Sequence, residues 1–145
     1  MNFKDIQVRF SPEEWKKIHW GVSDCYGQCD AFDRKYDSLS ERIDFDACGV
    51  EVLMTWRDYR LLAGMMANII QYLLFVPHLI GKELYGMKDA NVDLCCAMEA
   101  LRVILSNRAF DDGLDAVFAS IGERKDQKRN RSKLGALKPF ITNTD

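Results

Sequence analysis

The chain has few of the residues that build catalytic sites. Its 145 residues include two histidines, His19 and His78, and neither belongs to a local motif for a nucleophilic serine or cysteine. The nine glycines are scattered, so there is no glycine-rich loop of the kind that binds phosphate. These absences argue against the common enzyme classes, and we expect no catalytic residues and no cofactor.

A metal site is not expected either. Cys25 and Cys29 have the spacing of two ligands on one face of a helix, yet structural zinc needs four ligands and the other cysteines form no recognisable second pair. Both residues also fall on an apolar helical seam, where cysteine behaves as a small hydrophobe. An odd count of five cysteines without a secretory signal indicates free thiols in a reducing compartment, so we expect a cytoplasmic protein.

Charged side chains are missing from residues 61–81, a run of 21 residues between Arg60 and Lys82. About 20 apolar residues cross a bilayer, so the run has the length of a membrane span. Polar residues interrupt it, however, and five residues recur at steps of three or four, which places them on one stripe of a helix. These are Arg57, Arg60, Gly64, Asn68 and Gln71. The stripe favours a core helix over a membrane span, and we expect no membrane association.

Two segments of the chain, residues 7–16 and 51–60, share a layout that marks the start of a helix. Each has a short apolar stretch, then a hydroxyl residue, and an acidic residue three positions later. Ser11 and Thr55 can accept a hydrogen bond from the first helical turn, and an acidic residue suits the positive end of a helix. The layout predicts that one helix begins after Ser11 and another after Thr55.

The first of these starts, residues 6–15, resembles the opening of ribbon-helix-helix DNA-binding proteins, in which a strand leads into a capped helix. The resemblance covers about ten residues. It then departs from that family, whose first helix is short, because the apolar seam here continues to Tyr36. The resemblance implies a strand followed by a helix.

The apolar periodicity predicts a mostly helical α+β fold with a long helix at its centre. The expected helices cover residues 12–37, 55–76, 89–107 and 111–121, of which 55–76 is the central one. Alternating apolar residues predict a small antiparallel sheet. Its expected strands cover residues 5–10, 42–46 and 50–54. An all-α bundle is the alternative.

Charge divides the chain unevenly. Residues 1–121 hold 13 Lys and Arg against 19 Asp and Glu, a net charge of −6, whereas residues 122–145 hold 7 against 3, a net charge of +4. We therefore expect one globular domain over residues 1–122 and a basic, flexible tail over residues 123–145.

Two functional interpretations follow. The first is a non-enzymatic intracellular protein-binding module that acts by occupying the surface of a partner, as small inhibitors, immunity proteins and phage-encoded antagonists do. Acidic residues around the end of the first helix would attract a basic partner, and exposed arginines suit a binding hot spot. The candidate partner-binding residues are Asp30, Asp33, Asp37, Glu41, Arg57 and Arg60.

The alternative is a nucleic-acid-associated regulator, monomeric or homodimeric, that binds through the basic tail. A handful of cations is enough for salt-sensitive binding to phosphates without sequence preference. The candidate residues are Arg124, Lys125, Lys128, Arg129, Arg131 and Lys133.

Overall fold

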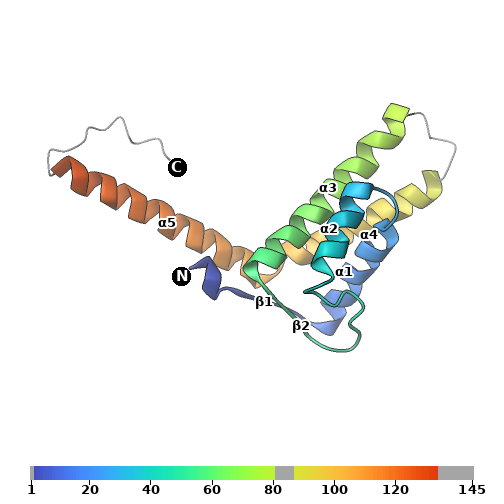
Figure 1. The fold of residues 1–145 in the computed structure, drawn as a ribbon, viewed down its shortest axis with the longest axis horizontal. Helices are drawn as coiled ribbons and strands as arrows, with labels where there is room; N and C mark the ends of the chain where they lie inside the picture. The colour runs from blue at the N-terminus through green and yellow to red at the C-terminus, as the bar shows by residue number, and fades with distance from the viewer. Residues whose placement is uncertain (1, 81–86, 134–145) are drawn as a thin grey trace.

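The computed structural model describes the backbone of residues 2–80 and 87–133 and the side chains of residues 2–75 and 92–123. The elements in chain order are the 3-10 helix η1 (Phe3–Asp5), β1 (Gln7–Phe10), α1 (Pro12–Cys25), α2 (Asp30–Leu39), β2 (Val52–Thr55), α3 (Trp56–Ile80), α4 (Met87–Leu105) and α5 (Arg108–Lys133). The mostly helical α+β fold is therefore confirmed, with five α-helices in the described part of the chain where four were expected (Figure 1).

The sheet consists of the two antiparallel strands β1 and β2, and it excludes the all-α alternative. The register pairs Val8 with Met54 and Phe10 with Val52. All four side chains are buried, which puts one face of the sheet in the core.

The prediction of a third strand over residues 42–46 is wrong. This segment forms turns, although Ile43 and Phe45 are buried as the alternation requires. Side chains of α1 bind the backbone that a strand neighbour would have bound: the Trp15 indole N–H donates to the Phe45 carbonyl oxygen at 3.3 Å, and His19 Nδ1 lies 2.8 Å from the same oxygen. The Asp46 N–H donates to the Asp44 carboxylate at 3.0 Å, which closes a tight turn.

Both predicted helix starts are confirmed. Ser11 and Glu14 form a reciprocal capping box, in which the Glu14 N–H donates to Ser11 Oγ at 3.1 Å and the Ser11 N–H donates to Glu14 Oε1 at 2.8 Å. At the second start, the Asp58 N–H donates to Thr55 Oγ1 at 3.2 Å.

The single helix expected over residues 12–37 is wrong, because the chain breaks after Cys25 and resumes as α2. Gly27 adopts φ +92° in this break, a conformation that favours glycine. The expected seam of apolar residues continues across the break, with Cys25 and Phe32 buried on the two helices.

Helix α3 lies at the centre and contacts α2, α4 and both strands. It continues through Pro77 to Ile80, so the expected end at residue 76 is wrong. Its core side holds buried apolar side chains, which are Tyr59, Leu62, Met65, Met66, Ile69 and Leu73. Within residues 2–80 and 87–133, no helix combines the length and apolar character that crossing a membrane requires.

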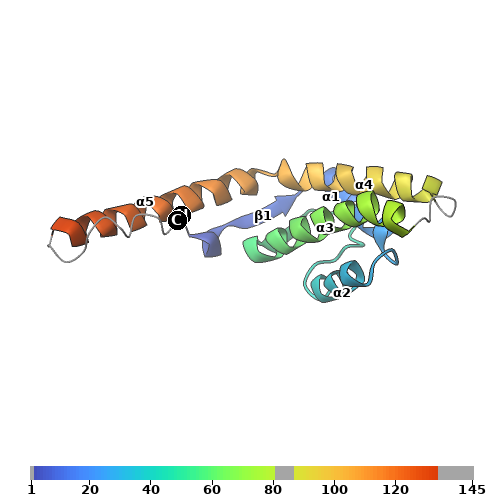
Figure 2. The same ribbon diagram turned by 90° about the horizontal axis from the view of Figure 1, so that it is seen from above.

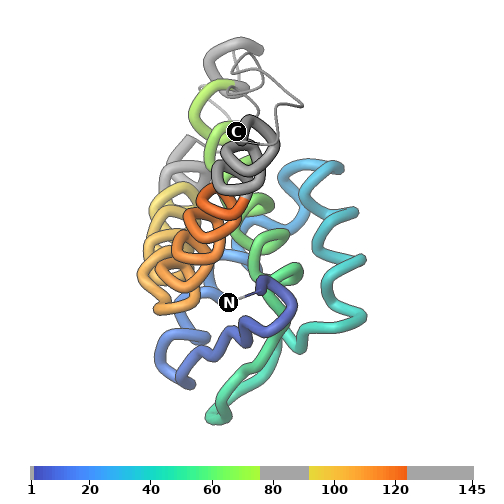
Figure 3. Tube along the Cα trace, turned by 90° about the vertical axis from the view of Figure 1, so that its left-hand side faces the viewer, coloured from blue at the N-terminus to red at the C-terminus, as the bar shows by residue number. Residues whose placement is uncertain are grey.

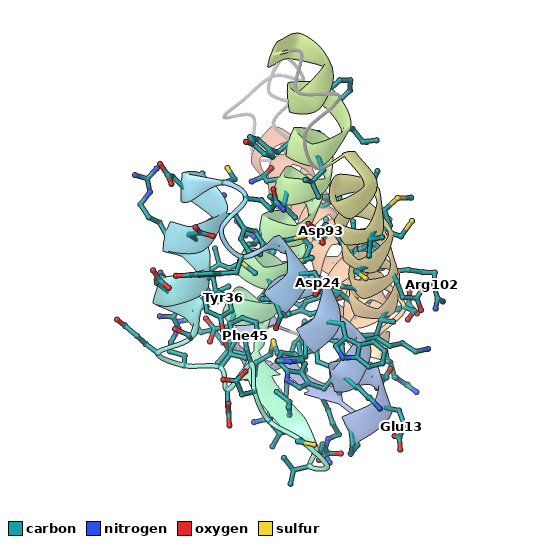
Figure 4. All side chains as sticks on the ribbon, turned by 90° about the vertical axis from the view of Figure 1, so that its right-hand side faces the viewer. Glu13, Asp24, Tyr36, Phe45, Asp93 and Arg102 are labelled. Atoms are coloured by element: carbon teal, nitrogen blue, oxygen red, sulfur yellow. The ribbon has the colours of Figure 1, made fainter. Side chains whose placement is uncertain are left out.

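Helices α1 and α4 approach each other closely at Gly21. A Cβ at this position would lie 2.5 Å from Ala100 Cβ and 2.7 Å from the Cys96 carbonyl oxygen. Figure 4 shows α1 and α4 side by side at this contact, with Asp24 and Asp93 labelled on them. A glycine is therefore required where the two helices meet.

Helix α5 projects from the rest of the molecule, as Figures 1 and 2 show. Its first turns are fixed to the body, because Gly113 lies against the Trp56 ring and the Asn107 side-chain amide donates to the Arg9 carbonyl oxygen at 2.7 Å. The helix runs past Gly122 to Lys133, so the end expected at residue 121 is wrong, and the expected boundary between domain and tail falls inside α5. Residues 134–145 of that tail lie outside the described residues.

Candidate protein-binding surface

A groove of about 320 Å³ lies between α2 and α3. Its lining residues are Lys35, Ser38, Leu39, Arg60, Leu61, Gly64 and Met65. Leu39 and Met65 are buried and form an apolar floor, whereas Leu61 is 43% exposed. Lys35 from α2 and Arg60 from α3 supply one cation from each side. We call this surface the α2–α3 groove.

Gly64 opens the groove. Apart from its own chain neighbours and helix backbone, no atom lies within 4 Å of the position that its Cβ would occupy, in contrast to Gly21 and Gly113. The helix positions one turn to either side, Arg60 and Asn68, are exposed. The polar stripe predicted from the sequence is thus the exposed edge of α3, and Arg57, Gly64 and Gln71 are exposed along it as well.

The α1–α2 turn sets the position of α2. The Gly27 N–H donates to the Asp33 carboxylate at 2.9 Å, and the Tyr26 hydroxyl donates to Asp37 Oδ1 at 3.2 Å. The hydrogen bond to Asp37 raises the pKa of Tyr26 above its usual value. Tyr36 then stacks on Phe45 with ring centroids 4.8 Å apart, which holds α2 against the following turns (Figure 4).

An ion pair holds the segment after α2 to the start of α3. Arg42 Nε lies 2.9 Å from Asp58 Oδ1, and the Asp58 side chain is 8% exposed. A nearly buried carboxylate needs such a partner because its desolvation is costly. The pair therefore fixes the first turn of α3, from which Arg60 reaches the groove.

The structure places the predicted partner-binding residues in three different settings. Asp33 and Asp37 bind the α1–α2 turn, and Asp30 and Glu41 are exposed at the beginning and after the end of α2. Of the two arginines, Arg60 lines the α2–α3 groove, and Arg57 is exposed one turn earlier.

Sequence reasoning missed Lys35 and Leu61 as parts of this surface. Lys35, Ser38 and Leu39 follow helical spacing on α2, which was the signal that they share one side. The spacing alone does not show that α3 lies beside this side of α2, because that contact joins residues about 25 positions apart in the sequence.

The candidate nucleic-acid residues, Arg124, Lys125, Lys128, Arg129, Arg131 and Lys133, all fall within α5. Their backbone is helical, and their side chains lie outside the described ones. The structure therefore brings them together on the last ten residues of one projecting helix.

A second cleft, of about 400 Å³, lies between α1 and residues 46–49. It is lined by Pro12, Glu13, Lys16, His19, Trp20, Asp46, Ala47, Cys48 and Gly49. Trp20 is 52% exposed, and the Lys16 ammonium lies 5.1 Å from its ring centroid. His19 Nδ1 is engaged by the Phe45 carbonyl oxygen and lies 3.7 Å from Asp46 Oδ1, so this histidine fastens the turn to α1.

The thiols of the α1–α4 contact are protonated at neutral pH. Burial raises the pKa of Cys25 to about 12 and, together with a hydrogen bond to Asp24, the pKa of Cys96 to about 11. Since metal binding and nucleophilic attack need the thiolate, these thiols suit packing. Among the described side chains, no group of three His, Cys, Asp or Glu residues is arranged to hold a metal ion. Compared with protein-family models, with curated proteins and with solved structures, the chain matches none of them.

Proposed function

We propose that the chain is a protein-binding module that acts by occupying the surface of a partner, and that the α2–α3 groove is its contact surface. The observation that carries the proposal is the combination of an apolar floor, Leu39 and Met65, with the two cations Lys35 and Arg60. An apolar centre with arginine beside it is the usual composition of a binding hot spot.

The chemistry of the groove selects the partner segment. A floor of this size accepts one large apolar side chain, and the cations Lys35 and Arg60 favour carboxylates on both sides of it. We therefore propose that the partner presents a leucine-like or aromatic side chain flanked by Asp or Glu. Arg57, exposed one turn before Arg60, is proposed as an outer contact. The exposed carboxylates Asp30 and Glu41 would repel such a segment, so the acidic partner proposed for the groove replaces the basic partner expected from these residues.

Selection from an unbiased library of displayed peptides on the immobilised full chain tests this proposal. We expect enrichment of sequences in which one large apolar residue is flanked by acidic residues. Lys35→Glu and Arg60→Glu should each weaken the binding of an enriched peptide at least tenfold. Arg34→Glu is the matched control, because Arg34 is an exposed cation of α2 that does not line the groove. Enrichment of basic peptides, or equal loss in the control, contradicts the proposal.

The alternative function, binding of nucleic acid through the basic end of the chain, is favoured by one specific observation. Residues 124–133 carry six Lys and Arg with one Asp, and they belong to a helix that projects from the body. A rise of 1.5 Å per residue brings these cations within about 15 Å along the helix axis. Binding should weaken steeply with salt and be lost when residues 123–145 are removed. Equal binding by the truncated chain would exclude this alternative.

A further inference from the structure

Helix α5 directs its small side chains toward the body and its large apolar side chains away from it. Ala109 and Ala116 are buried, and Gly113 lies against the Trp56 ring. The exposed apolar side chains are Phe110 at 38%, Leu114 at 41%, Val117 at 39% and Phe118 at 66%. A helix that only packed on its own core would have the opposite arrangement.

The exposed apolar residues form one continuous stripe. Their spacing of four, three and one places Phe110, Leu114, Val117 and Phe118 on one side of the helix. We call this stripe the α5 apolar face. In Figures 1 and 2 no other described element lies along α5 beyond its first turns, and Figure 3 views the part of α5 up to residue 123 nearly end-on. A contiguous apolar face on a projecting helix marks a protein interaction site.

We propose that the α5 apolar face binds the same face of a second copy of this chain, with the two α5 helices antiparallel. The charge distribution selects this occupant. Residues 124–133 carry a net charge of +5, whereas residues 1–121 carry −6. Antiparallel pairing directs the basic end of each α5 toward the acidic body of the other copy. Parallel pairing would place the two basic ends together, at a cost in repulsion.

Two-fold symmetry would allow α5 to make both an apolar contact and a charged contact with the second copy. In a two-fold dimer the same patch serves both copies, so the apolar faces meet at the centre and each basic end reaches the opposite body. A stable interface buries about 800 Å² on each partner, which is more than four side chains can offer. The charged contacts beyond the apolar face are therefore part of the interface. This surface is separate from the α2–α3 groove, and the inference stands without the proposed function.

The mass of the full chain as a function of concentration, measured by sedimentation equilibrium, tests the inference. We expect a monomer–dimer equilibrium that Phe118→Glu shifts toward the monomer by at least tenfold in the dissociation constant. Phe75→Glu is the matched control, because Phe75 on α3 is 62% exposed and lies on a different helix. It should dimerise like the wild type. Both substitutions replace an exposed side chain, and circular dichroism confirms that each variant is folded.

The salt dependence tests the orientation. An antiparallel dimer should dissociate more readily as the salt concentration rises, because salt screens the attraction between basic ends and acidic bodies. A dimer that tightens with salt would overturn the antiparallel arrangement. A monomer at every concentration up to about 1 mM, far above a micromolar dissociation constant, would overturn self-association altogether. Dimerisation of a chain without residues 134–145, but not of the full chain, would also overturn the inference, since it would mean that the α5 apolar face is covered within one full-length chain.

Discussion

Tyr59 joins the first turn of α3 to the end of α4. Its hydroxyl donates to the Ile104 carbonyl oxygen at 2.7 Å, and its ring is 2% exposed. Tyr59→Phe should lower the free energy of unfolding by about 1 to 2 kcal/mol, because a buried acceptor loses its donor while the ring still fills its space. Urea unfolding monitored by circular dichroism measures this difference. Tyr26→Phe is the control: it also removes a hydroxyl that donates a hydrogen bond, to Asp37, but its ring is 48% exposed, so water can replace the lost donor and we expect a change within about 0.5 kcal/mol.

Cys25 predicts how the stability responds to alkaline pH. Burial raises the pKa of its thiol to about 12 in the folded chain, whereas an unfolded thiol titrates near 8.5. Between these values the folded state holds a proton that the unfolded state has lost, so stability is complete below pH 8.5 and falls as pH rises. The fall is at most about 1.4 kcal/mol per pH unit. Tyr59, whose burial raises its pKa to about 12, adds to the fall above pH 10.

Unfolding of the reduced protein in urea at pH 8 and pH 10 measures this effect. Cys25→Ala should be less stable than the wild type at pH 8 and should lose less stability on going to pH 10. An identical loss in both proteins would show that Cys25 does not contribute to the alkaline response.

The close contact between α1 and α4 depends on the glycine at position 21. Gly21→Val should lower the free energy of unfolding by about 1 to 3 kcal/mol, because the new atoms meet Ala100 Cβ and the Cys96 carbonyl oxygen. Ala100→Gly in the same chain should recover part of this loss, since it removes one of the two obstacles. Gly64→Ala is the matched control in an open helical position, and we expect a gain of about 0.5 to 1 kcal/mol. Thermal unfolding of the wild type and these three variants gives the comparison.

Elements whose starts depend on local chemistry were predictable from the sequence. Ser11 and Thr55 bind amides only three residues away, so the residues that make the cap are adjacent in the sequence. The prediction of a strand over residues 42–46 was wrong because alternating apolar residues indicate only which side chains are buried. Ile43 and Phe45 are buried as expected, but the pattern does not show which groups bind the backbone. Here Trp15 and His19 bind it, and nothing in the local sequence reveals a partner about 30 residues away.

Helix ends were less predictable because apolar periodicity records packing. The pattern stops at Gly122, but Glu, Arg, Lys and Gln favour helices, and α5 continues through them. The seam from Trp15 to Tyr36 likewise appears unbroken, although Gly27 turns the chain between two helices that face the same core. The unrecognised break at Gly27 also explains why the α2–α3 groove was not predicted. Because α2 is a separate helix, the side that it turns toward α3 is set by how it packs after the break.

At the scale of the whole molecule, the chain divides into a packed body and a projecting arm. Among the described side chains, the core draws on α1 to α4 and the sheet, whereas α5 contributes only its first turns, through Ala109, Ala116 and the contact of Gly113 with the Trp56 ring of α3. Isolated helical turns are marginally stable in water, and most helical stability comes from packing. The part of α5 beyond Ala116 should therefore depend on whatever covers its apolar face.

Amide hydrogen exchange at two protein concentrations tests this dependence. Amides of residues 97–104 in α4 should exchange slowly at both concentrations, because they belong to the buried core. Amides of residues 117–123 should exchange rapidly in dilute protein and at least tenfold more slowly in concentrated protein, where a second copy covers the α5 apolar face. Phe118→Glu should remove the concentration dependence and leave the exchange of α4 unchanged. Slow exchange of residues 117–123 at both concentrations would mean that a single chain stabilises the arm by itself, and the division into body and arm would then be wrong.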